Sequence, residues 1–504
     1  MVRFWRNALL TLHVRADLRP TRAAMAAAIS LVICFLLAMT IWSADHGKTR
    51  DFLPDFYGWL LGSQFVVLGV WSAMACGQAV SRERELKTFD FLKTTRLTAG
   101  ELLVGKLLGA PIVAYFVVAC TLPISIVAGL LGGIRPAAVL GSLALLVVFN
   151  LFYSLVAVWG SMLVEKTSAG AVGLLGLLVN GVALGFADGP FKGFAALSVV
   201  PAVLSLHGIT ELGVGTVRPT VFGAEVPCFL LTVLLYVLLG AWFVLMIVRN
   251  LKRDLPQIQL LSRWQCVGLV AFWNLLFYAF LDTGDIRNSR LPFSSRMPAF
   301  DVAAMALGWN SLFLFLTGVA ALSPHEKLKI WWRKWKGGEA SYFSPQGLPW
   351  PWLVPAGAIA FAMLAAEAFG LRSTVPLSEW RLGLDALLFT AFLTVITRDV
   401  LFLQWCLLTR MKHAVVKGFL FLTLYYAAAI IVGVVISTFA ETASRRVMMF
   451  LIVYPLLGEV ERRTIAPALI VGIIGVQVVV CVLILLVIQG RLARPAKVAA
   501  VGTT

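Results

Sequence analysis

Long apolar runs separated by short polar segments alternate along the whole chain. A helix needs about 20 mostly apolar residues to cross the hydrocarbon core of a bilayer. The runs that reach this length predict twelve spans, at residues 24–44, 55–80, 103–132, 137–164, 169–187, 221–248, 265–283, 299–322, 351–371, 382–405, 419–440 and 466–489. Two other apolar stretches do not fit as spans, because 190–206 is broken by prolines and 447–458 is too short. We expect both to be outer-face helices, and the whole pattern predicts an all-α, multi-pass membrane protein.

Composition points to the same class. Of the 504 residues, 60% are hydrophobic and 13% are charged, whereas soluble proteins are about 45–50% apolar and about 25% charged. This balance excludes a soluble enzyme and a disulfide scaffold. The seven cysteines and five histidines are scattered without metal-ligand spacing, and no Ser/His/Asp or carboxylate set converges. We therefore expect no catalytic residues, no metal and no cofactor.

The net charge of +17 has an explanation in the membrane. Basic residues collect in loops that stay on the cytoplasmic side and face anionic headgroups, so we expect membrane lipids as partners and no nucleic acid. If the N-terminus is inside, the predicted inner segments hold the larger share of the 42 Lys and Arg residues. Both termini are therefore predicted to be cytoplasmic.

The predicted spans divide into two sets of six. In each half, two spans precede a basic inner loop, and an outer loop with a short apolar helix separates the last two spans. This layout is typical of an internal duplication. The predicted parts are an amphipathic connecting helix at 1–23, a first six-helix half at 24–250, a cytoplasmic linker at 251–264, a second, diverged half at 265–490 and a cytoplasmic tail at 491–504.

The inner loop at 81–102 carries the most informative pattern in the chain. Ser81 is placed to cap a short helix, and Leu86, Phe89 and Leu92 recur at helical spacing. Thr98 to Glu101 then fits a T-x-x-E capping box at the start of the next helix. Such an amphipathic helix either floats on the headgroups or fits into a groove on a soluble partner.

The residues from Glu83 to Lys106 favour the second use. The run E-R-E-L-K-T-F-D-F-L-K-T-T-R-L-T-A-G-E-L-L-V-G-K resembles the signature of ABC-2 type permeases, the membrane subunits of a class of ATP-binding-cassette exporters. The residues that match this signature are Glu83, Arg84, Glu85, Thr88, Leu92, Gly105 and Lys106. The stretch from Arg6 to Arg19 also looks like that family's N-terminal connecting helix.

The resemblance implies a coupling helix that docks on a separate ATPase subunit, which would hydrolyse the ATP, while this chain itself would not be an enzyme. The implied docking residues are Glu83, Arg84, Glu85, Leu86, Thr88, Phe89 and Leu92. Thr98 and Glu101 would begin the following helix, the G-x-x-x-G of Gly105 and Gly109 would let a neighbouring helix approach closely, and Lys106 would extend to the inner interface.

The second half departs from this signature. Its inner loop, 323–350, contains a basic, Trp-rich amphipathic stretch, His325 to Lys336. This stretch is either an interfacial anchor with tryptophans at headgroup depth or a diverged coupling helix. A fainter coupling candidate runs from Arg398 and Asp399 to His413.

We therefore expect a permease subunit in the plasma membrane of a bacterium, with an ATPase subunit and lipids as partners. Either one chain supplies the whole pathway, or two copies pair. The alternatives are an ion-coupled secondary transporter or a non-transporting membrane scaffold. Charges inside the predicted spans are scarce, and Glu367 and Asp385 lie near span ends. This scarcity disfavours an ion-coupled carrier. The pattern does not identify the substrate.

Overall fold

The computed structural model describes most of the chain as helix and divides it into two compact units. The described residues are 7–44, 49–86, 97–163, 178–186, 191–208, 218–252, 260–281, 298–370, 382–409, 414–438, 451 and 466–493. Unit 1 comprises Met1–Leu255 and Ala279–Thr283, and unit 2 comprises Pro256–Tyr278 and Gly284–Thr504.

Ten helices in the described part of the chain are long and apolar enough to cross a membrane. Their bounds are Pro20–Ser43, Phe52–Glu83, Ile112–Leu131, Pro136–Met162, Cys228–Asn250, Val302–Ala320, Trp350–Phe369, Leu382–Leu408, Lys417–Ile436 and Pro467–Ala493. They match ten of the twelve predicted spans, so the chain is a multi-pass, all-α membrane protein. Of the other two predicted spans, 265–283 is a helix of 17 residues, α12 (Arg263–Ala279), and 169–187 lies partly outside the described residues.

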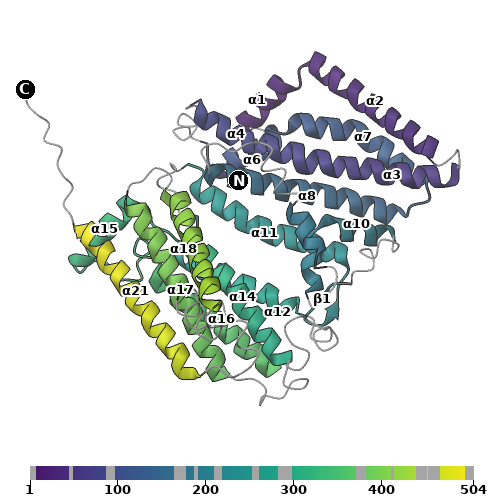
Figure 1. The fold of residues 1–504 in the computed structure, drawn as a ribbon. Coiled ribbons are helices and arrows are strands. Elements are labelled where there is room, and N and C mark those ends of the chain that lie inside the picture. Colours follow the sequence, from purple (N-terminus) through teal and green to yellow (C-terminus); the bar gives the residue numbers. More distant parts are fainter. Residues whose placement is uncertain are drawn as a thin grey trace, which may run out of the picture. The chain divides into compact units, whose positions relative to one another are not determined.

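Unit 1 is built from helices that pack side by side (Figure 1). Its elements are α1 (Ala8–Asp17), α2 (Pro20–Ala44), α3 (Thr49–Val66), η2 (Val67–Ser72), α4 (Ala73–Glu85), α6 (Ala99–Gly109), α7 (Ile112–Leu131), α8 (Pro136–Leu163), η3 (Lys192–Leu197), α10 (Val199–His207), β1 (Thr220–Val221), β2 (Ala224–Glu225) and α11 (Cys228–Asn250). α3, the π-helical turn η2 and α4 form one continuous rod through the unit. The apolar core near the end of this rod includes Val80, Leu103, Val158 and Ile247.

The predicted span 103–132 is not one helix, and this prediction was wrong in detail. The chain forms α6 up to Gly109, turns at Ala110 and Pro111, and begins α7 at Ile112. Proline has no backbone N–H, so it cannot donate to the carbonyl four residues earlier. Here that carbonyl belongs to Leu107, and the Tyr115 hydroxyl donates to it instead, at 2.8 Å.

The predicted outer-face segment 190–206 forms two short helical pieces, η3 and α10. α10 begins after Ser198, whose hydroxyl accepts from the Val200 N–H. It ends at Gly208, whose positive φ of 70° suits glycine at a helix C-terminus. Neither piece is long enough to cross a bilayer. The other predicted outer-face segment, 447–458, lies outside the described residues except for Leu451.

Unit 2 is centred on one long helix, α17 (Leu382–Leu408), against which α14, α16, α18 and α21 pack (Figure 1). The elements of the unit, besides most of α12, are α14 (Pro298–Ala320), α15 (His325–Lys336), α16 (Trp350–Gly370), α17, α18 (Ala414–Ser437) and α21 (Pro467–Ala493). α12 is joined to α14 by a buried pair of amides, since Asn274 and Asn310 each donate to the other at 2.8 and 2.9 Å.

Candidate functional site

The residues singled out by the sequence gather at one end of unit 1, where α1, α4 and α6 meet. Ser81 does not cap a new helix, and that prediction was wrong. α4 continues through Ser81 to Glu85, and Ser81 is buried inside it. Backbone hydrogen bonds carry the helix on, and the Leu86 N–H still donates to the Arg82 carbonyl at 3.0 Å. The Glu83–Glu85 motif is therefore the last turn of a membrane helix.

Glu83 and Lys106 form an ion pair between α4 and α6. Lys106 is 1% exposed, so its side chain is enclosed by the protein, and its extension to the inner interface stays a prediction. Its ammonium group also donates to the Ala79 carbonyl at 3.3 Å. The Glu83 side chain keeps 23% of its surface exposed. Glu83 thus faces the neighbouring helix, whereas Glu85 and Leu86 are exposed.

The start of α6 is fixed by a capping box. The Thr98 hydroxyl accepts from the Glu101 N–H at 3.2 Å, and the Glu101 carboxylate accepts from the Thr98 N–H at 2.9 Å. These bonds satisfy helix N–H groups that have no partner inside the helix. They also stabilise the ionised carboxylate, and the pKa of Glu101 is lowered, first by the Thr98 backbone and then by its hydroxyl.

α1 packs directly on α6 at two glycines. A Cβ on Gly105 would lie 2.8 Å from the Leu9 side chain, and one on Gly109 would lie 2.8 Å from His13. The G-x-x-x-G of α6 thus receives α1, the predicted connecting helix. Asn7 joins the two as well, because its amide donates to the Glu101 carbonyl at 2.7 Å while its side-chain oxygen caps α1 at Leu9.

The rest of the predicted docking segment lies outside the described part of the chain. Thr88, Phe89 and Leu92 fall there, and so does the side chain of Arg84. What the structure does describe is both flanks of that segment: the last turn of α4 and the capped start of α6. The ion pair and the contacts with α1 hold these two flanks in one packed cluster, which we call the α1–α4–α6 junction.

In unit 2, the Trp-rich stretch forms the amphipathic helix α15. Trp331 and Trp332 are 1% and 7% exposed and pack against Leu401, Leu408 and Ile488 of α17 and α21. These two rings therefore pack within the protein, and the interpretations of this stretch as an interfacial anchor and as a diverged coupling helix both stay predictions. The outward face carries Arg333, Lys334 and Lys336. Because the apolar face is already covered, a partner on α15 would contact charges rather than apolar anchors.

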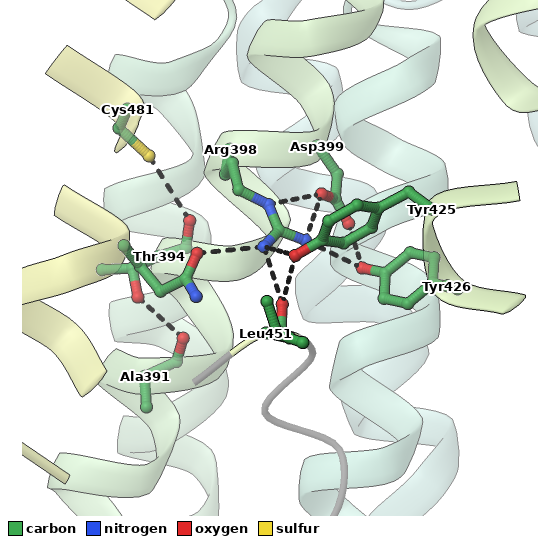
Figure 2. Close-up of polar contacts among 9 residues, drawn as sticks. Ala391, Thr394, Arg398, Asp399, Tyr425, Tyr426, Leu451 and Cys481 are labelled. Carbon is green, nitrogen blue, oxygen red and sulfur yellow. Dashed lines mark hydrogen bonds and ion pairs between the residues drawn. The ribbon is translucent and has the colours of Figure 1, made fainter. Parts of the chain in front are cut away.

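A buried pair of opposite charges lies inside α17 of unit 2, where sequence reasoning had placed only a faint coupling candidate. Arg398 and Asp399 are 7% and 4% exposed, and Arg398 lies about 5 Å along the axis from the centre of the helix. The guanidinium donates to Asp399 from Nε at 2.9 Å and from Nη2 at 2.7 Å (Figure 2). The Tyr426 hydroxyl of α18 donates to the other carboxylate oxygen.

Uncharged groups complete this network. Arg398 Nη1 donates to Tyr425 Oη at 3.2 Å, to Gln477 Oε1 at 3.0 Å and to the Leu451 carbonyl at 3.0 Å. The Tyr425 ring also lies 5.0 Å from the guanidinium carbon. We call this set the Arg398 network. It joins α17 to α18 and α21, and Figure 2 shows Tyr425 and Tyr426 converging on the same guanidinium.

Sequence reasoning missed the Arg398 network for an identifiable reason. Arg398 and Asp399 are adjacent, and neighbours along a helix do not normally face each other. Their other partners lie 27 to 79 residues further along the chain. The available signal was the presence of two ionisable residues within an apolar run, since charges inside spans usually mark a buried polar site.

Comparison with known proteins identifies no relative. No protein-family model, no curated protein and no solved structure matches this chain. The structure therefore establishes the class, a multi-pass helical membrane protein with a polar junction in unit 1 and a buried ionic network in unit 2.

Proposed function

We propose that this chain is the transmembrane subunit of a transporter that is driven by a separate ATPase subunit, of the ABC-2 type that the signature at Glu83–Lys106 resembles. The observation that carries the proposal is the α1–α4–α6 junction. The signature begins in the last turn of α4 and ends within α6, the two helices that the Glu83–Lys106 pair joins. Export as the direction of transport follows from the resemblance alone.

The geometry of the junction supports a mechanical role. α4 ends just before the segment between Leu86 and Leu97, and the capped helix α6 begins just after it. A partner that displaces this segment would act on both helices at once, because Lys106 and Glu83 tie them together. α4 continues into the span Phe52–Glu83, so such a displacement would reach the membrane directly.

The exposed residues give the docking surface its chemistry. Glu85 and Leu86 are exposed at the end of α4, and Leu86 is 62% exposed. A carboxylate beside an apolar side chain suits a partner groove with a basic rim and an apolar floor. Glu83, by contrast, already has an internal partner. We therefore assign docking to Glu85 and Leu86, and assign Glu83 to the link between the two helices.

The test is co-purification with an ATPase encoded by a neighbouring reading frame. The full chain carries the tag, and the variant is Glu85→Ala with Leu86→Ala, which leaves the Glu83–Lys106 pair intact. Loss of one buried anchor costs about 1–3 kcal/mol, so retained ATPase should fall about fivefold or more. Phe222→Ala is the matched control, since Phe222 is an equally exposed apolar side chain (66%) at the turn between β1 and β2.

Two results would contradict the proposal: no ATPase retained by the unmodified chain, or equal retention by the docking variant and the Phe222→Ala control. A third variant, Arg333→Ala with Lys334→Ala, tests α15 separately. If α15 also docks an ATPase, this variant should lose it as well. If only unit 1 docks, the α15 variant should behave like the control.

The Arg398 network favours a second candidate, an ion-coupled carrier. Such carriers keep ionisable groups deep in the membrane, and Asp399 lies there. However, both oxygens of Asp399 already accept hydrogen bonds from Arg398 and Tyr426, which leaves the carboxylate occupied. Proton flux measured in proteoliposomes separates the two candidates. A flux that needs no ATP and disappears in Asp399→Asn would favour the carrier.

A further inference from the structure

Unit 1 contains a cavity that the proposed ATPase coupling does not use. It has a volume of about 720 Å³ and is lined by α3, η2, α8 and α10, together with the loop at Gly133–Arg135. This lies within the roughly 300–1,000 Å³ range typical of small-molecule sites. Most of its lining is apolar and includes Leu61, Phe65 and Phe149. A cavity of this size is large enough to bind a small molecule.

Two glycines of α3 form the open floor of the cavity. Gly58 and Gly62 are four residues apart, so they lie on one face of the helix, and both line the cavity. Small residues at this spacing usually receive a neighbouring helix, as Gly105 and Gly109 receive α1. At Gly58 and Gly62, by contrast, an added Cβ would meet no atom within 4 Å. The space above them is open.

The cavity has a polar end formed by Tyr57, Arg135 and His207, all of which line it. The Tyr57 residue is 2% exposed, and neither Tyr57 Oη nor His207 Nδ1 makes a hydrogen bond to a described residue. The neighbouring Ser142 hydroxyl is engaged with the Ala138 carbonyl at 2.9 Å and with His207 Nε2 at 3.0 Å. Buried polar atoms without partners are costly, which points to a ligand that supplies one.

The cationic group at this end is the Arg135 guanidinium. Burial lowers the pKa of His207, and the nearby Arg135 lowers it further, so the imidazole is neutral at pH 7. Arg135 is exposed, and its guanidinium donates to the Leu206 carbonyl at 3.3 Å, which leaves other N–H groups of the fork available. Asp55 lines the same end but is engaged in an interaction of its own. A ligand head with an anionic oxygen suits Arg135 and the Tyr57 hydroxyl.

The cavity is long enough for one lipid chain. Its lining on α3 runs from Pro54 to Val66, about 18 Å at 1.5 Å per residue, and continues to Gly69 and Val70 of η2. One leaflet of the hydrocarbon core is about 15 Å deep. Val66 and Val200 line the cavity and are 57% and 39% exposed, so the opening has an apolar rim. A molecule could enter sideways from the bilayer.

We propose that this cavity binds a single-chain amphiphile with an anionic head, such as a fatty acid or a lysophospholipid. The acyl chain lies over Gly58 and Gly62, and the head meets Arg135 and Tyr57. The site is independent of the ATPase proposal, because binding can be measured on the chain alone.

The experiment is photolabelling of the full chain in nanodiscs with a palmitate analogue that carries a photoreactive group on its acyl chain, followed by peptide mass spectrometry. Labels should concentrate on α3, α8 and α10. Gly58→Leu with Gly62→Leu fills the floor and should reduce this labelling about tenfold or more. Gly160→Leu is the matched control, since its Cβ also meets nothing within 4 Å but it does not line the cavity.

A second variant keeps the test valid if the filled variant folds poorly. Arg135→Gln is an exposed change that leaves the apolar floor intact, and it should weaken competition by unlabelled palmitate about tenfold, the effect expected of one hydrogen bond to a charged group. Competition by lysophosphatidylglycerol tests a phosphate head, whereas octadecanol, which lacks the charge, should compete at least tenfold less well.

Three results would overturn the proposal. Labels could spread evenly over the lipid-facing helices α2 and α18. Octadecanol could compete as well as palmitate, which would remove the role of the anionic head. The filled variant could change the oligomeric state of the chain, measured by mass photometry in the same nanodiscs, without changing the labelling. In that case a helix of a second copy, rather than an amphiphile, occupies the cavity.

Discussion

Each unit contains an ion pair whose basic residue is buried, and the two pairs, Glu83–Lys106 and Arg398–Asp399, are built differently. Glu83 and Lys106 come from different helices, and Glu83 stays partly exposed. Arg398 and Asp399 are neighbours on one helix, and both are buried. The first pair can therefore separate when α4 and α6 move, with water available to the carboxylate. The second pair cannot separate, because its two residues are adjacent on one helix. It forms hydrogen bonds with Tyr425, Tyr426 and Gln477 of other helices.

Ion pairs therefore stabilise helix packing in two distinct ways in this chain. In unit 1 the ionic attraction itself links two helices. In unit 2 the ion pair lies within α17. Its hydrogen bonds to Tyr425, Tyr426 and Gln477 link α17 to α18 and α21. Removing one charge should therefore have different consequences for stability in the two units.

Asp399→Asn should have the largest effect. It keeps the shape of the side chain but leaves the Arg398 charge uncompensated inside the membrane, which costs about 3–5 kcal/mol of unfolding free energy. The double variant Arg398→Met with Asp399→Leu removes both charges and should recover most of that loss, because apolar replacement of a buried pair is often neutral. Reversible unfolding in detergent or bicelles measures both. Equal destabilisation by the single and double variants would show that the hydrogen bonds to α18 and α21 matter more than the charge balance.

The Glu83–Lys106 pair should respond asymmetrically. Glu83→Gln removes the negative charge beside Lys106, which is 1% exposed, and should cost about 2–4 kcal/mol. Lys106→Met leaves a carboxylate that water can reach, and should cost about 1–2 kcal/mol. A double-mutant cycle on unfolding free energy gives the coupling between them. If the two single variants were equally destabilising, the partial exposure of Glu83 would not be the deciding factor.

Thr98→Ala should have the smallest effect. It removes the hydroxyl that accepts from the Glu101 N–H, and loss of such a cap costs about 1 kcal/mol. Thr98→Ser keeps the hydroxyl and serves as the control. Thermal unfolding followed by circular dichroism measures the difference. A Thr98→Ala chain as stable as the Ser variant would mean that contacts with α1, rather than the cap, fix the start of α6.

Local patterns in the sequence carried much of the fold. Apolar run length located ten spans, because the bilayer imposes the same length on every crossing helix. The T-x-x-E pattern located the start of α6 at Thr98, since both hydrogen bonds of a capping box are made within four residues. The spacing of Gly105 and Gly109 indicated a close helix contact. It did not indicate that the partner would be α1, because that depends on tertiary packing.

The remaining parts depend on contacts that no local pattern encodes. Ser81 can cap a helix or sit inside one, and the choice depends on whether the preceding span continues. The proline that breaks the helix at residue 111 was present in the sequence, but the prediction of a single span at 103–132 relied on the length of the apolar run. The depth of Arg398 was hidden because its partners lie on α18, α21 and at Leu451. The cavity over Gly58 and Gly62 could not be foreseen, because a glycine pair beside open space and a glycine pair packed against a helix have the same spacing in the sequence.

The turn at Pro111 has a consequence for how strain could travel. Because α6 stops there, it is not a rigid lever that extends through the bilayer as part of α7. A push at Thr98 would tilt a short rod of 11 residues about its own far end. The tilt would pass to α1 and α4, which pack against α6, and to α7 through the Tyr115–Leu107 hydrogen bond that bridges the turn at Ala110–Pro111.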